Sequence, residues 1–532
     1  MPAYKVKVKW GKQSYPDIEV NTDEPPILFK AQLFTLTGVQ PERQKVMLKG
    51  VTLKDDDWGA FVLKNGVTVL LMGSKEEDVP VEPVEKTRFV EDMNESELAT
   101  ALDLPAGLTN LGNTCYMNAT VQCLKTVPEL KDALLEYKGA TFNMAGGGNT
   151  PPAQSITAAL RDLYSSMEKG NTVPPVVLLQ VLHMSFPRFA EKSEHGGFTQ
   201  QDANECWTEM VRMLQQKLPA KISDSENAEK YKSIIDQYFG EKYKSIIDQY
   251  FGGSFDVEWK CVETEDESST KKWKCVETED ESSTKSTEQF LQLSCFISQD
   301  VRYMHSGLRS KMQEQITKMS PTLERDAVYT KTSKISRLPA YLTVQFVRFY
   351  YKEKESFYYK EKESINAKIL KDVKFPMDFD AFELCSAELQ EKLAPMRSKF
   401  KEYEDKLVEE AAKGKDVVKD NNKGDGKEKE QRKYAPFSFE DDLGSNNSGY
   451  YTLQAVLTHR GRSSSSGHYV GWVKHSEGVW IKCDDDKVSP VSTEDILKLS
   501  GGGDWHCAYV LLYGPRLLEL PNETDETMTV DQ

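Results

Sequence analysis

The chain has 532 residues, of which 39% are hydrophobic and 29% are charged. This length is too great for one small core and allows several domains of about 100–200 residues each. The 68 Lys and Arg residues against 84 Asp and Glu residues give a net charge of −16, which argues against a general binder of nucleic acid or of anionic membranes.

The sequence has no targeting or membrane-spanning pattern. No apolar run approaches the roughly 18 residues of a membrane span, and residues 1–12 alternate apolar and basic residues without a secretory core. The cysteines number 9, and no CxxC pair occurs among them, which disfavours a disulfide scaffold and a thiolate zinc site. We therefore expect a reducing, intracellular location: the cytoplasm, with the nucleus open as a second compartment.

The first segment, residues 4–72, is predicted to be a compact β-rich unit with one helix. Apolar and polar residues alternate in its strands, whereas the stretch after Pro26 has a helical apolar face. The expected elements are a hairpin of Tyr4–Trp10 with Asp17–Val20, a helix that begins at Thr22–Pro26, and strands at Lys45–Leu48 and Val67–Met72.

This pattern resembles ubiquitin, with QKVMLKG and NGVTVLLMG at the corresponding places. The resemblance implies a β-grasp ubiquitin-like domain over residues 1–75. The chain continues through Gly-Ser-Lys at residues 73–75, so we expect a built-in docking domain and not a conjugated modifier. Met47, Leu70 and Met72 lie near the place of ubiquitin's exposed apolar patch and are expected to bind a partner. For Met47, an ordinary core position is the alternative.

Composition divides the remainder of the chain. Residues 76–103 are acidic and punctuated by proline, as is typical of a flexible linker. Residues 104–514 mix helical and strand patterns, which predicts one large α+β domain. Within it, about 399–434 is almost continuously charged and is expected to be a partly helical, then disordered insertion. Residues 515–532 form an acidic tail.

Three stretches recur in tandem with full identity: residues 241–252 repeat 229–240, residues 273–285 repeat 259–271, and residues 357–364 repeat 349–356. A solenoid repeats one unit at a fixed period, whereas these three periods differ. We favour a faulty gene model over recent local duplication. Peptides that span the junctions would decide between the two.

One cysteine has the surroundings of a nucleophile. Residues 107–123 read GLTNLGNTCYMNATVQC, in which a Gly- and Asn-rich turn leads into a stretch with helical apolar spacing. Cys115 is therefore expected at a helix N-terminus, where the helix dipole favours a thiolate. Asn110 is placed to direct its amide toward a developing oxyanion. The alternative, a buried structural cysteine, fits Cys123, Cys206 and Cys295 better.

A nucleophilic cysteine requires a base, and the base requires an orienting acceptor. His468 lies where a Gly- and Ser-rich loop enters the predicted strand HYVGWVK, and Asp484 follows the predicted strand WIKC. A lone histidine is more often structural than catalytic. Cys115, His468 and Asp484 nevertheless fit the three roles in chain order.

These motifs together resemble the ubiquitin-specific protease family. GLTNLGNTCYMNATVQC is similar to its cysteine box, and GHYVGWV with WIKCDDDKV is similar to its histidine box. Residues 200–205 (QQDANE), 338–349 (LPAYLTVQFVRF) and 501–513 (GGGDWHCAYVLLY) resemble other boxes in the family's order. The resemblance spans about 105–514. It implies a papain-like α+β fold with fingers, palm and thumb.

The resemblance also implies the reaction, which is hydrolysis of the bond after ubiquitin's C-terminal glycine through a thioester. Cys115 would be the nucleophile and His468 the general base and then acid. Asp484 would orient His468, and Asn110 would donate to the oxyanion. Cys483 stands where the family usually has an aromatic residue, which affects the packing of Asp484 but leaves its carboxylate.

The resemblance further implies a substrate site and the absence of metal. Gln201, Asp202 and Glu205 are expected to bind the ubiquitin tail, and the two carboxylates would pair with its basic residues. A solvated helix face is the alternative. Many relatives carry paired CxxC motifs in the fingers, whereas this chain has none, so we expect no structural zinc and no cofactor.

The loop before His468 suggests regulation. Arg460 and Arg462 precede Ser465 at the spacing that a basophilic kinase reads. The resemblance implies that this loop can cover the cleft, and a phosphate on Ser465 would add roughly −1.5 to −2 charges and displace it. A flexible Ser-rich loop without regulation is the alternative.

An N-terminal ubiquitin-like domain before such a protease resembles the proteasome-associated branch of the family. It implies binding to ubiquitin, to polyubiquitin chains and to the regulatory particle of the 26S proteasome, with chain trimming and ubiquitin recycling as the function. No coiled-coil pattern suggests a dimer, so we expect a monomer when free. One alternative is a non-catalytic adaptor that regulates degradation sterically. Another is a different Cys-His acyl-transfer enzyme, such as a transglutaminase-like fold, which the boxes at 200–205 and 338–349 disfavour.

Overall fold

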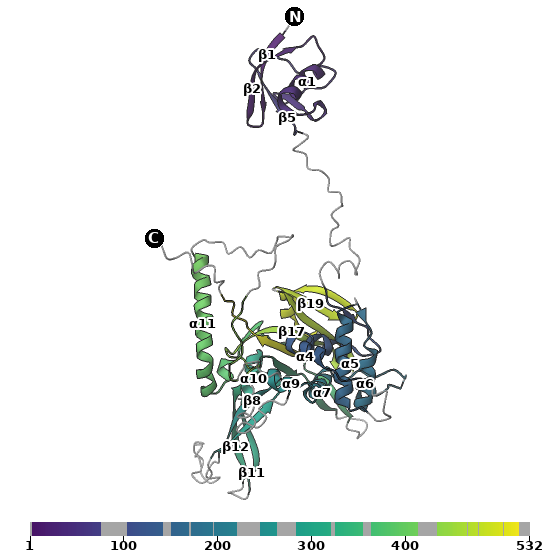
Figure 1. Ribbon diagram of the computed structural model, residues 1–532, viewed down its shortest axis with the longest axis vertical. Coiled ribbons are helices and arrows are strands. Elements are labelled where there is room, and N and C mark those ends of the chain that lie inside the picture. The colour runs from purple at the N-terminus through teal and green to yellow at the C-terminus, as the bar shows by residue number, and fades with distance from the viewer. Residues whose placement is uncertain are drawn as a thin grey trace. The chain divides into compact units, whose positions relative to one another are not determined.

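The computed structural model describes residues 3–75, 104–141, 150–169, 172–194, 196–220, 245–262, 283–320, 325–354, 363–412, 433–464, 466–476, 478–503 and 505–520. The chain divides into two compact units, Met1–Met93 and Asn94–Gln532 (Figure 1). The boundaries of the ubiquitin-like domain, linker and catalytic domain stay predictions at the residue level. No helix in the described ranges has the length and apolar content to cross a membrane.

The first unit is a 5-stranded sheet with one helix, in the strand order β2-β1-β5-β3-β4. Its elements are β1 (Ala3–Trp10), β2 (Gln13–Asn21), α1 (Pro26–Thr37), a 3-10 turn (Pro41–Arg43), β3 (Lys45–Leu48), β4 (Val51–Thr52) and β5 (Thr68–Met72). β1 pairs antiparallel with β2 and parallel with β5. The helix begins with Pro26, whose fixed φ suits a first turn, and ends at Gly38, where φ is 75°. The predicted hairpin, helix and strands are confirmed, and their arrangement is a β-grasp.

The second unit is built on an 8-stranded sheet, ordered β10-β13-β21-β17-β18-β19-β20, with β16 paired to β17. These strands are β10 (Leu293–Phe296), β13 (Leu342–Val347), β16 (Asp378–Asp380), β17 (Tyr450–Ser463), β18 (Ser466–Ser476), β19 (Val479–Asp484), β20 (Lys487–Ser492) and β21 (Cys507–Pro515). β21 lies inside the sheet and is buried along its whole length. Its nearly unbroken apolar sequence follows from coverage on both faces.

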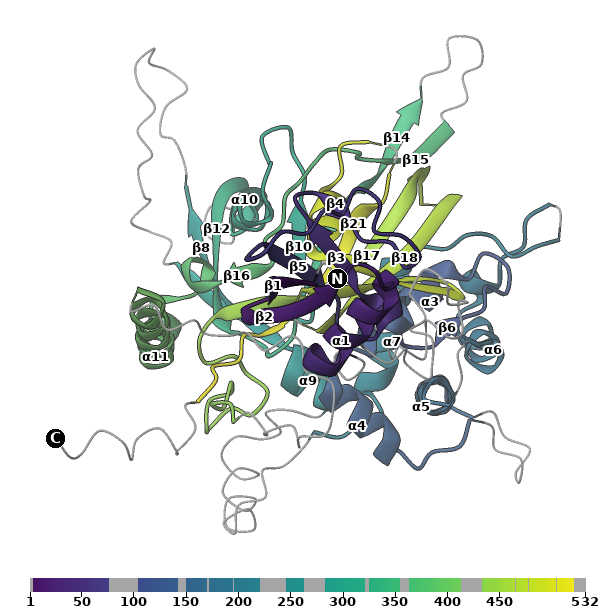
Figure 2. The same ribbon diagram turned by 90° about the horizontal axis from the view of Figure 1, so that it is seen from above.

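Helices cover one side of this sheet. They are α3 (Cys115–Leu124), α4 (Pro128–Glu136), α5 (Pro152–Met167), α6 (Val176–Ser185), α7 (Ala203–Gln215) and α9 (Ile246–Phe251), with a 3-10 turn at Pro187–Ala190. α3 packs against β18, β17 and α7, and Figure 2 shows α3 beside β18. Every residue of α3 is buried, so this short helix is held by packing and not by its own helix propensity.

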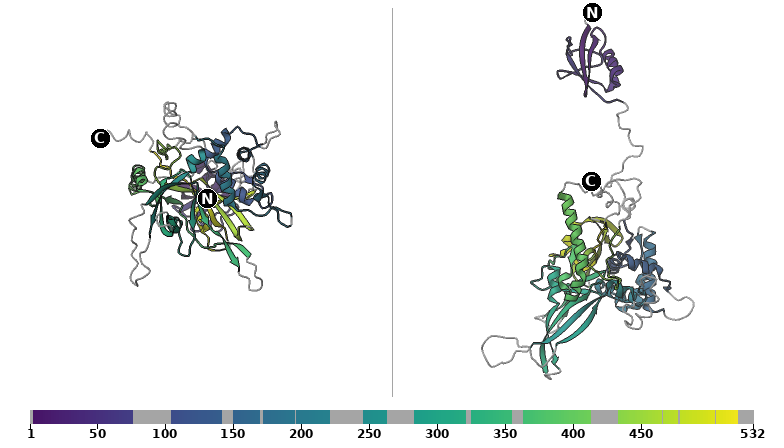
Figure 3. Two further views of the ribbon diagram at one scale, coloured as in Figure 1. Left: turned by 90° about the horizontal axis from the view of Figure 1, so that it is seen from below. Right: turned by 60° about the vertical axis from the view of Figure 1, so that its left-hand side comes forward.

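A second sheet extends away from the 8-stranded one, as the right-hand view of Figure 3 shows. It consists of β11 (Gln313–Ser320), β12 (Arg325–Arg337), β8 (Gly253–Cys261) and β9 (Thr284–Phe290), all paired antiparallel in that order. The remaining elements are β6 (Gly107–Leu108), β7 (Thr172–Val173), α10 (Met304–Ser310), β14 (Phe349–Lys354), β15 (Glu363–Lys368), α11 (Ala387–Ala412), α12 (Thr493–Leu497) and 3-10 turns at Phe382–Leu384 and Lys498–Ser500.

The predicted charged insertion at about 399–434 does not begin as a separate segment. Residues 399–412 continue α11, which starts at Ala387. Phe400 is 3% exposed and packs with Ala435 and Leu518, so this charged stretch contributes one anchor to a small core. The rest of the insertion, 413–432, lies outside the described residues.

The first repeated stretch has one copy in the core. Within 241–252, the second copy, residues Ile246–Phe251 form α9, and Ile246, Ile247 and Phe251 are each at most 2% exposed. The first copy lies outside the described residues. One copy therefore accounts for the packing at this position.

Candidate functional site

Cys115 is the first residue of α3 and is 2% exposed. The turn before it is built from side-chain bonds: Asn110 Oδ1 accepts from the Thr114 N–H at 3.2 Å, and Thr114 Oγ1 accepts from the Leu111 N–H at 2.9 Å. Asn113 adopts a φ of 55°, which asparagine tolerates better than most residues. The predicted helix start at Cys115 is confirmed, and its sulfur lies at the positive end of the helix.

The β17–β18 hairpin brings His468 to Cys115. His468 lies opposite Arg460 near the start of β18, and the following residue, Tyr469, donates its backbone N–H to Cys115 Sγ at 3.4 Å. Hydrogen bonds from the imidazole to Asp484 and then to Cys115 raise the pKa of His468 to about 10. The imidazole therefore holds a proton at neutral pH and places a positive charge beside the Cys115 sulfur.

Asp484 ends β19, the strand next to β18, and its Oδ1 lies 2.6 Å from His468 Nε2. Lys482 Nζ lies 2.8 Å from the other carboxylate oxygen. The bond to His468 first, and Lys482 second, lower the pKa of Asp484 well below its usual value. The structure thus brings Cys115, His468 and Asp484 into one chain of contacts.

Asp485, which the sequence interpretation missed, holds two asparagines in place. Its carboxylate accepts from Asn110 Nδ2 and from Asn118 Nδ2, both at 2.8 Å, and it is 9% exposed. Burial raises the pKa of Asp485. The Asn110 amide thus donates to Asp485, and its predicted hydrogen bond to an oxyanion stays a prediction. The run of three aspartates after Cys483 gave no signal to separate the middle one from its neighbours.

The predicted substrate residues are mostly engaged within the protein. Asp202 caps α7 by accepting from the Asn204 N–H at 2.7 Å, and it also accepts from Tyr509 Oη at 2.8 Å and 2.9 Å. Gln201 Nε2 donates to Thr199 Oγ1 at 2.8 Å. Glu205 is exposed and lies 3.4 Å from Arg188. Of the two carboxylates predicted to meet a basic tail, Glu205 is the more accessible.

Two further histidines lie near the site in a different charge state. His459 Nε2 bonds the Ser466 carbonyl at 3.0 Å, and burial, with Lys368 nearby, lowers its pKa to about 3. Burial likewise lowers the pKa of His506 to about 4. Both are neutral at physiological pH. His468 is thus distinguished from its histidine neighbours by its charge. Ser465, the predicted phosphorylation site, lies outside the described residues.

His468, Asp484 and Asp485 also form the one group in the described part of the chain with ligand atoms close enough for a metal ion, within 4.8 Å of one another. Their polar atoms are already bonded to each other, to Lys482 or to asparagine amides. Cys261 and Cys295 are buried, and Cys275 lies outside the described residues. The expectation of no zinc stays a prediction.

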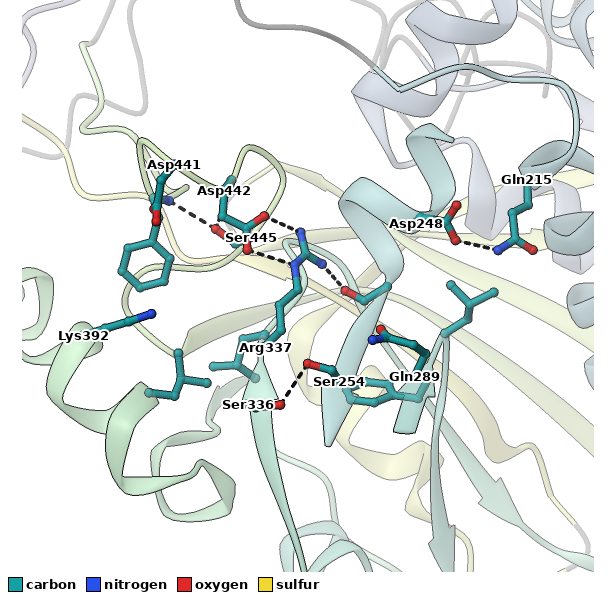
Figure 4. Close-up of a pocket in the computed structure, with 16 residues that line it drawn as sticks. Gln215, Asp248, Ser254, Gln289, Ser336, Arg337, Lys392, Asp441, Asp442 and Ser445 are labelled. Carbon is teal, nitrogen blue, oxygen red and sulfur yellow. Dashed lines mark hydrogen bonds and ion pairs between the residues drawn. The ribbon is translucent and has the colours of Figure 1, made fainter. Parts of the chain in front are cut away.

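A cavity away from these residues lies among α9, α11 and the base of the second sheet (Figure 4). It has a volume of about 690 Å³, and none of Cys115, His468 and Asp484 lines it. Figure 4 shows Arg337 directed at Asp442, with two N···O distances of 3.0 Å. Because Asp442 neutralises this guanidinium, the cavity offers no free arginine for an anion.

In the first unit, the predicted docking residues share one face of the sheet. Met47 and Leu70 are opposite each other in the β3–β5 pair, and Met72 lies two residues further along β5. Leu70 is 36% exposed and Met72 is 49% exposed, while Met47 is half-buried. The two exposed side chains of the three are therefore on β5.

The chain matches known proteins over nearly its full length. The profile of the family described as "Ubiquitin carboxyl-terminal hydrolase" matches residues 106–513. "Ubiquitin carboxyl-terminal hydrolase 7" of Arabidopsis thaliana is 39% identical over 97% of this chain and 99% of its own. "Ubiquitin carboxyl-terminal hydrolase 14" of Caenorhabditis elegans is 39% identical, with coverage of 97% and 94%. "Ubiquitin carboxyl-terminal hydrolase 6" of Schizosaccharomyces pombe is 37% identical, with coverage of 96% and 98%.

Among solved structures, a chain in "Structure of the SAGA Ubp8/Sgf11/Sus1/Sgf73 DUB module bound to ubiquitin aldehyde" is 20% identical, with a TM-score of 0.47. That match covers 77% of this chain and 69% of the other.

Proposed function

We propose that this chain, which belongs to the ubiquitin carboxyl-terminal hydrolase family of thiol deubiquitinases, acts at the proteasome. We further propose that Cys115, His468 and Asp484 carry out its catalysis. The observation that carries the catalytic assignment is the chain of contacts from Asp484 through His468 to Cys115. A nucleophile, a base and an orienting carboxylate are the groups that thiol hydrolysis requires.

In the proposed reaction, the Cys115 thiolate attacks the carbonyl carbon of ubiquitin's last glycine. The tetrahedral intermediate collapses, the lysine amine leaves with a proton from His468, and ubiquitin remains as a thioester on Cys115. His468 then takes a proton from water, whose oxygen attacks the thioester. Ubiquitin leaves with a free carboxylate, and Asp484 keeps the imidazole oriented throughout.

The N-terminal β-grasp unit supports a second proposal, which is docking on the regulatory particle of the 26S proteasome. Leu70 and Met72 present apolar, flexible side chains on an exposed sheet face. Tethering there would raise the concentration of the enzyme around proteasome-bound ubiquitin chains, so that it trims them and recycles ubiquitin. A cytoplasmic location, with the nucleus as a second compartment, follows from this proposal.

Regulation by phosphorylation of Ser465 remains part of the proposal. The β17–β18 connection that carries this residue leads directly into His468, so a phosphate there would act close to the reacting groups. Equal rates of ubiquitin hydrolysis by Ser465→Glu and wild type would remove this element and leave the catalytic assignment intact.

Hydrolysis of ubiquitin-amidomethylcoumarin, measured with and without purified 26S proteasomes, tests the proteasome proposal. We expect proteasomes to raise the rate of the wild type, and the double variant Leu70→Ser/Met72→Ser to lose most of that increase. Val62→Ser is the control, because Val62 is 67% exposed and lies outside β3 and β5. Equal stimulation of all three proteins would contradict docking through this face. If no protein hydrolysed the substrate in either condition, the adaptor alternative would replace the enzyme.

A further inference from the structure

Gln200, just before α7, lies against the sulfur of Cys115. Its Nε2 is 3.5 Å from Cys115 Sγ and its Oε1 is 3.8 Å from the same atom. The side chain is well buried, with the residue 8% exposed. Among the residues that the structure describes, Cys115 is the one hydrogen-bonding neighbour of this carboxamide.

This arrangement is unfavourable for a carboxamide with a purely structural role. A buried amide requires good hydrogen bonds, and a neutral thiol is a weak acceptor. A thiolate is a much better one, because a hydrogen bond to an ionised acceptor is about twice as strong as a neutral pair. The carboxamide is therefore better satisfied when Cys115 is ionised than when it is protonated.

The other amides near Cys115 are arranged differently. Asn110 donates its side-chain amide to Asp485, whereas the Tyr469 backbone N–H donates to Sγ from the side of β18 at 3.4 Å. Within the described part of the chain, Gln200 and Tyr469 are thus the two amide donors to the sulfur. The titratable groups that neighbour Cys115 are His468, which is protonated, and Tyr116 and Tyr469, which burial keeps neutral by raising the pKa of each phenol.

We propose that Gln200 is a further catalytic residue, whose carboxamide donates a hydrogen bond to the Cys115 thiolate and holds it in line with His468. The inference rests on the proposed function, because it assigns Gln200 a part in the same reaction. Gln200, the first glutamine of QQDANE, would thus act on Cys115. The sequence predicted substrate binding for Gln201, Asp202 and Glu205, which follow it.

Alkylation of Cys115 by iodoacetamide, followed on the Cys115 peptide by mass spectrometry, tests the donor role without ubiquitin. In Gln200→Leu, the apolar side chain keeps a similar volume but donates nothing. We expect the midpoint of the alkylation profile to rise by about one to two pH units, since a hydrogen bond to a charged group contributes about 1.5–3 kcal/mol. The rate at the alkaline plateau should stay equal or increase, because a less stabilised thiolate is more nucleophilic.

Turnover of ubiquitin-amidomethylcoumarin supplies the second readout. For Gln200→Leu we expect kcat to fall about 10- to 100-fold, somewhat less than the loss of a full oxyanion-hole donor, with KM within about twofold. Gln200→Glu should fall at least as far at neutral pH, because its carboxylate accepts hydrogen bonds and repels the thiolate.

Gln122→Leu is the matched control. Gln122 is 3% exposed on the same helix as Cys115, but its amide donates to the Ala106 carbonyl at 2.8 Å and not to sulfur. Its loss should lower Tm while the alkylation midpoint and kcat stay at wild-type values. A Gln200→Leu protein with the wild-type midpoint and kcat would overturn the proposal, as would a lower alkaline plateau with no shift of the midpoint. If the wild type failed to hydrolyse ubiquitin conjugates, the proposed function would fail, and the alkylation profiles would still decide the donor role.

Discussion

His468 Nε2 lies 2.6 Å from Asp484 Oδ1, across neighbouring strands of one sheet. This bond leaves the opposite ring nitrogen for Cys115, whose hydrogen bond to the imidazole also raises the pKa of His468. The sheet, which is rigid, therefore orients the imidazole, while the helix that begins at Cys115 presents the sulfur. The catalytic geometry thus depends on the packing of α3 against β18.

Asp484→Asn should lower kcat about 10²- to 10⁴-fold, because an amide cannot stabilise the imidazolium and can hold the imidazole in the wrong tautomer. Steady-state hydrolysis of ubiquitin-amidomethylcoumarin measures the change. Asp486→Asn is the control, since this neighbouring aspartate is exposed, and it should stay within about twofold of wild type. Equal kcat values for Asp484→Asn and wild type would remove the orienting role.

Asp485→Asn should destabilise the fold around Cys115. The carboxylate accepts from two asparagine amides, and an asparagine would turn its own NH₂ toward one of them. We expect a loss of about 1–3 kcal/mol in the free energy of unfolding, measured by urea denaturation. Asparagine tolerates the φ of 55° at this position, so backbone strain does not confuse the result. An unchanged denaturation midpoint would show that the charge of Asp485 adds no stability through Asn110 and Asn118.

The stability that protonated His468 contributes to the fold should decrease as the pH rises. Its pKa is raised from 6.5 to about 10 in the folded protein. The folded state therefore binds the proton more tightly, and the added stability is fully present below pH 6.5 and is lost as the pH rises toward 10. The difference in unfolding free energy between wild type and His468→Ala should be largest near pH 6 and should shrink toward pH 10. A difference that stays constant over this range would contradict the protonated His468–Asp484 pair.

Gly107→Ala should weaken the contact between the first strand of the second unit and the aspartate run. A Cβ at Gly107 would lie 2.6 Å from the backbone oxygen of Asp486, so one segment must shift. We expect a loss of about 1–3 kcal/mol in the free energy of unfolding together with reduced kcat. Gly197→Ala is the control, because its Cβ would meet nothing within 4 Å. Equal stability of the two variants would mean that the segments at this contact move apart at little cost in free energy.

The sequence was sufficient for those features that periodicity or a specific motif encodes. Alternation and helical spacing predicted the β-grasp elements and the helix that begins at Cys115, because one face of each is buried. They could not predict which partner a polar side chain selects. Asp485 and Gln200 lie far from Asn110 and Cys115 in the sequence, and the fold alone brings these pairs together.

The charged stretch from about residue 399 shows where a prediction from composition fails. Its composition predicted a segment outside the core, yet Phe400 is buried with Ala435 and Leu518. A single aromatic residue among many charges gives little signal in an average over composition. Its burial depends on two distant segments that happen to pack against α11.

The most direct test of the central claim is covalent labelling with ubiquitin that carries a C-terminal electrophile, with and without 26S proteasomes. We expect one adduct on Cys115, more adduct when proteasomes are present, and none in Cys115→Ala. A folded wild-type protein that forms no adduct in either condition, or an adduct that persists in Cys115→Ala, would contradict the assignment of Cys115 as the nucleophile of a deubiquitinase.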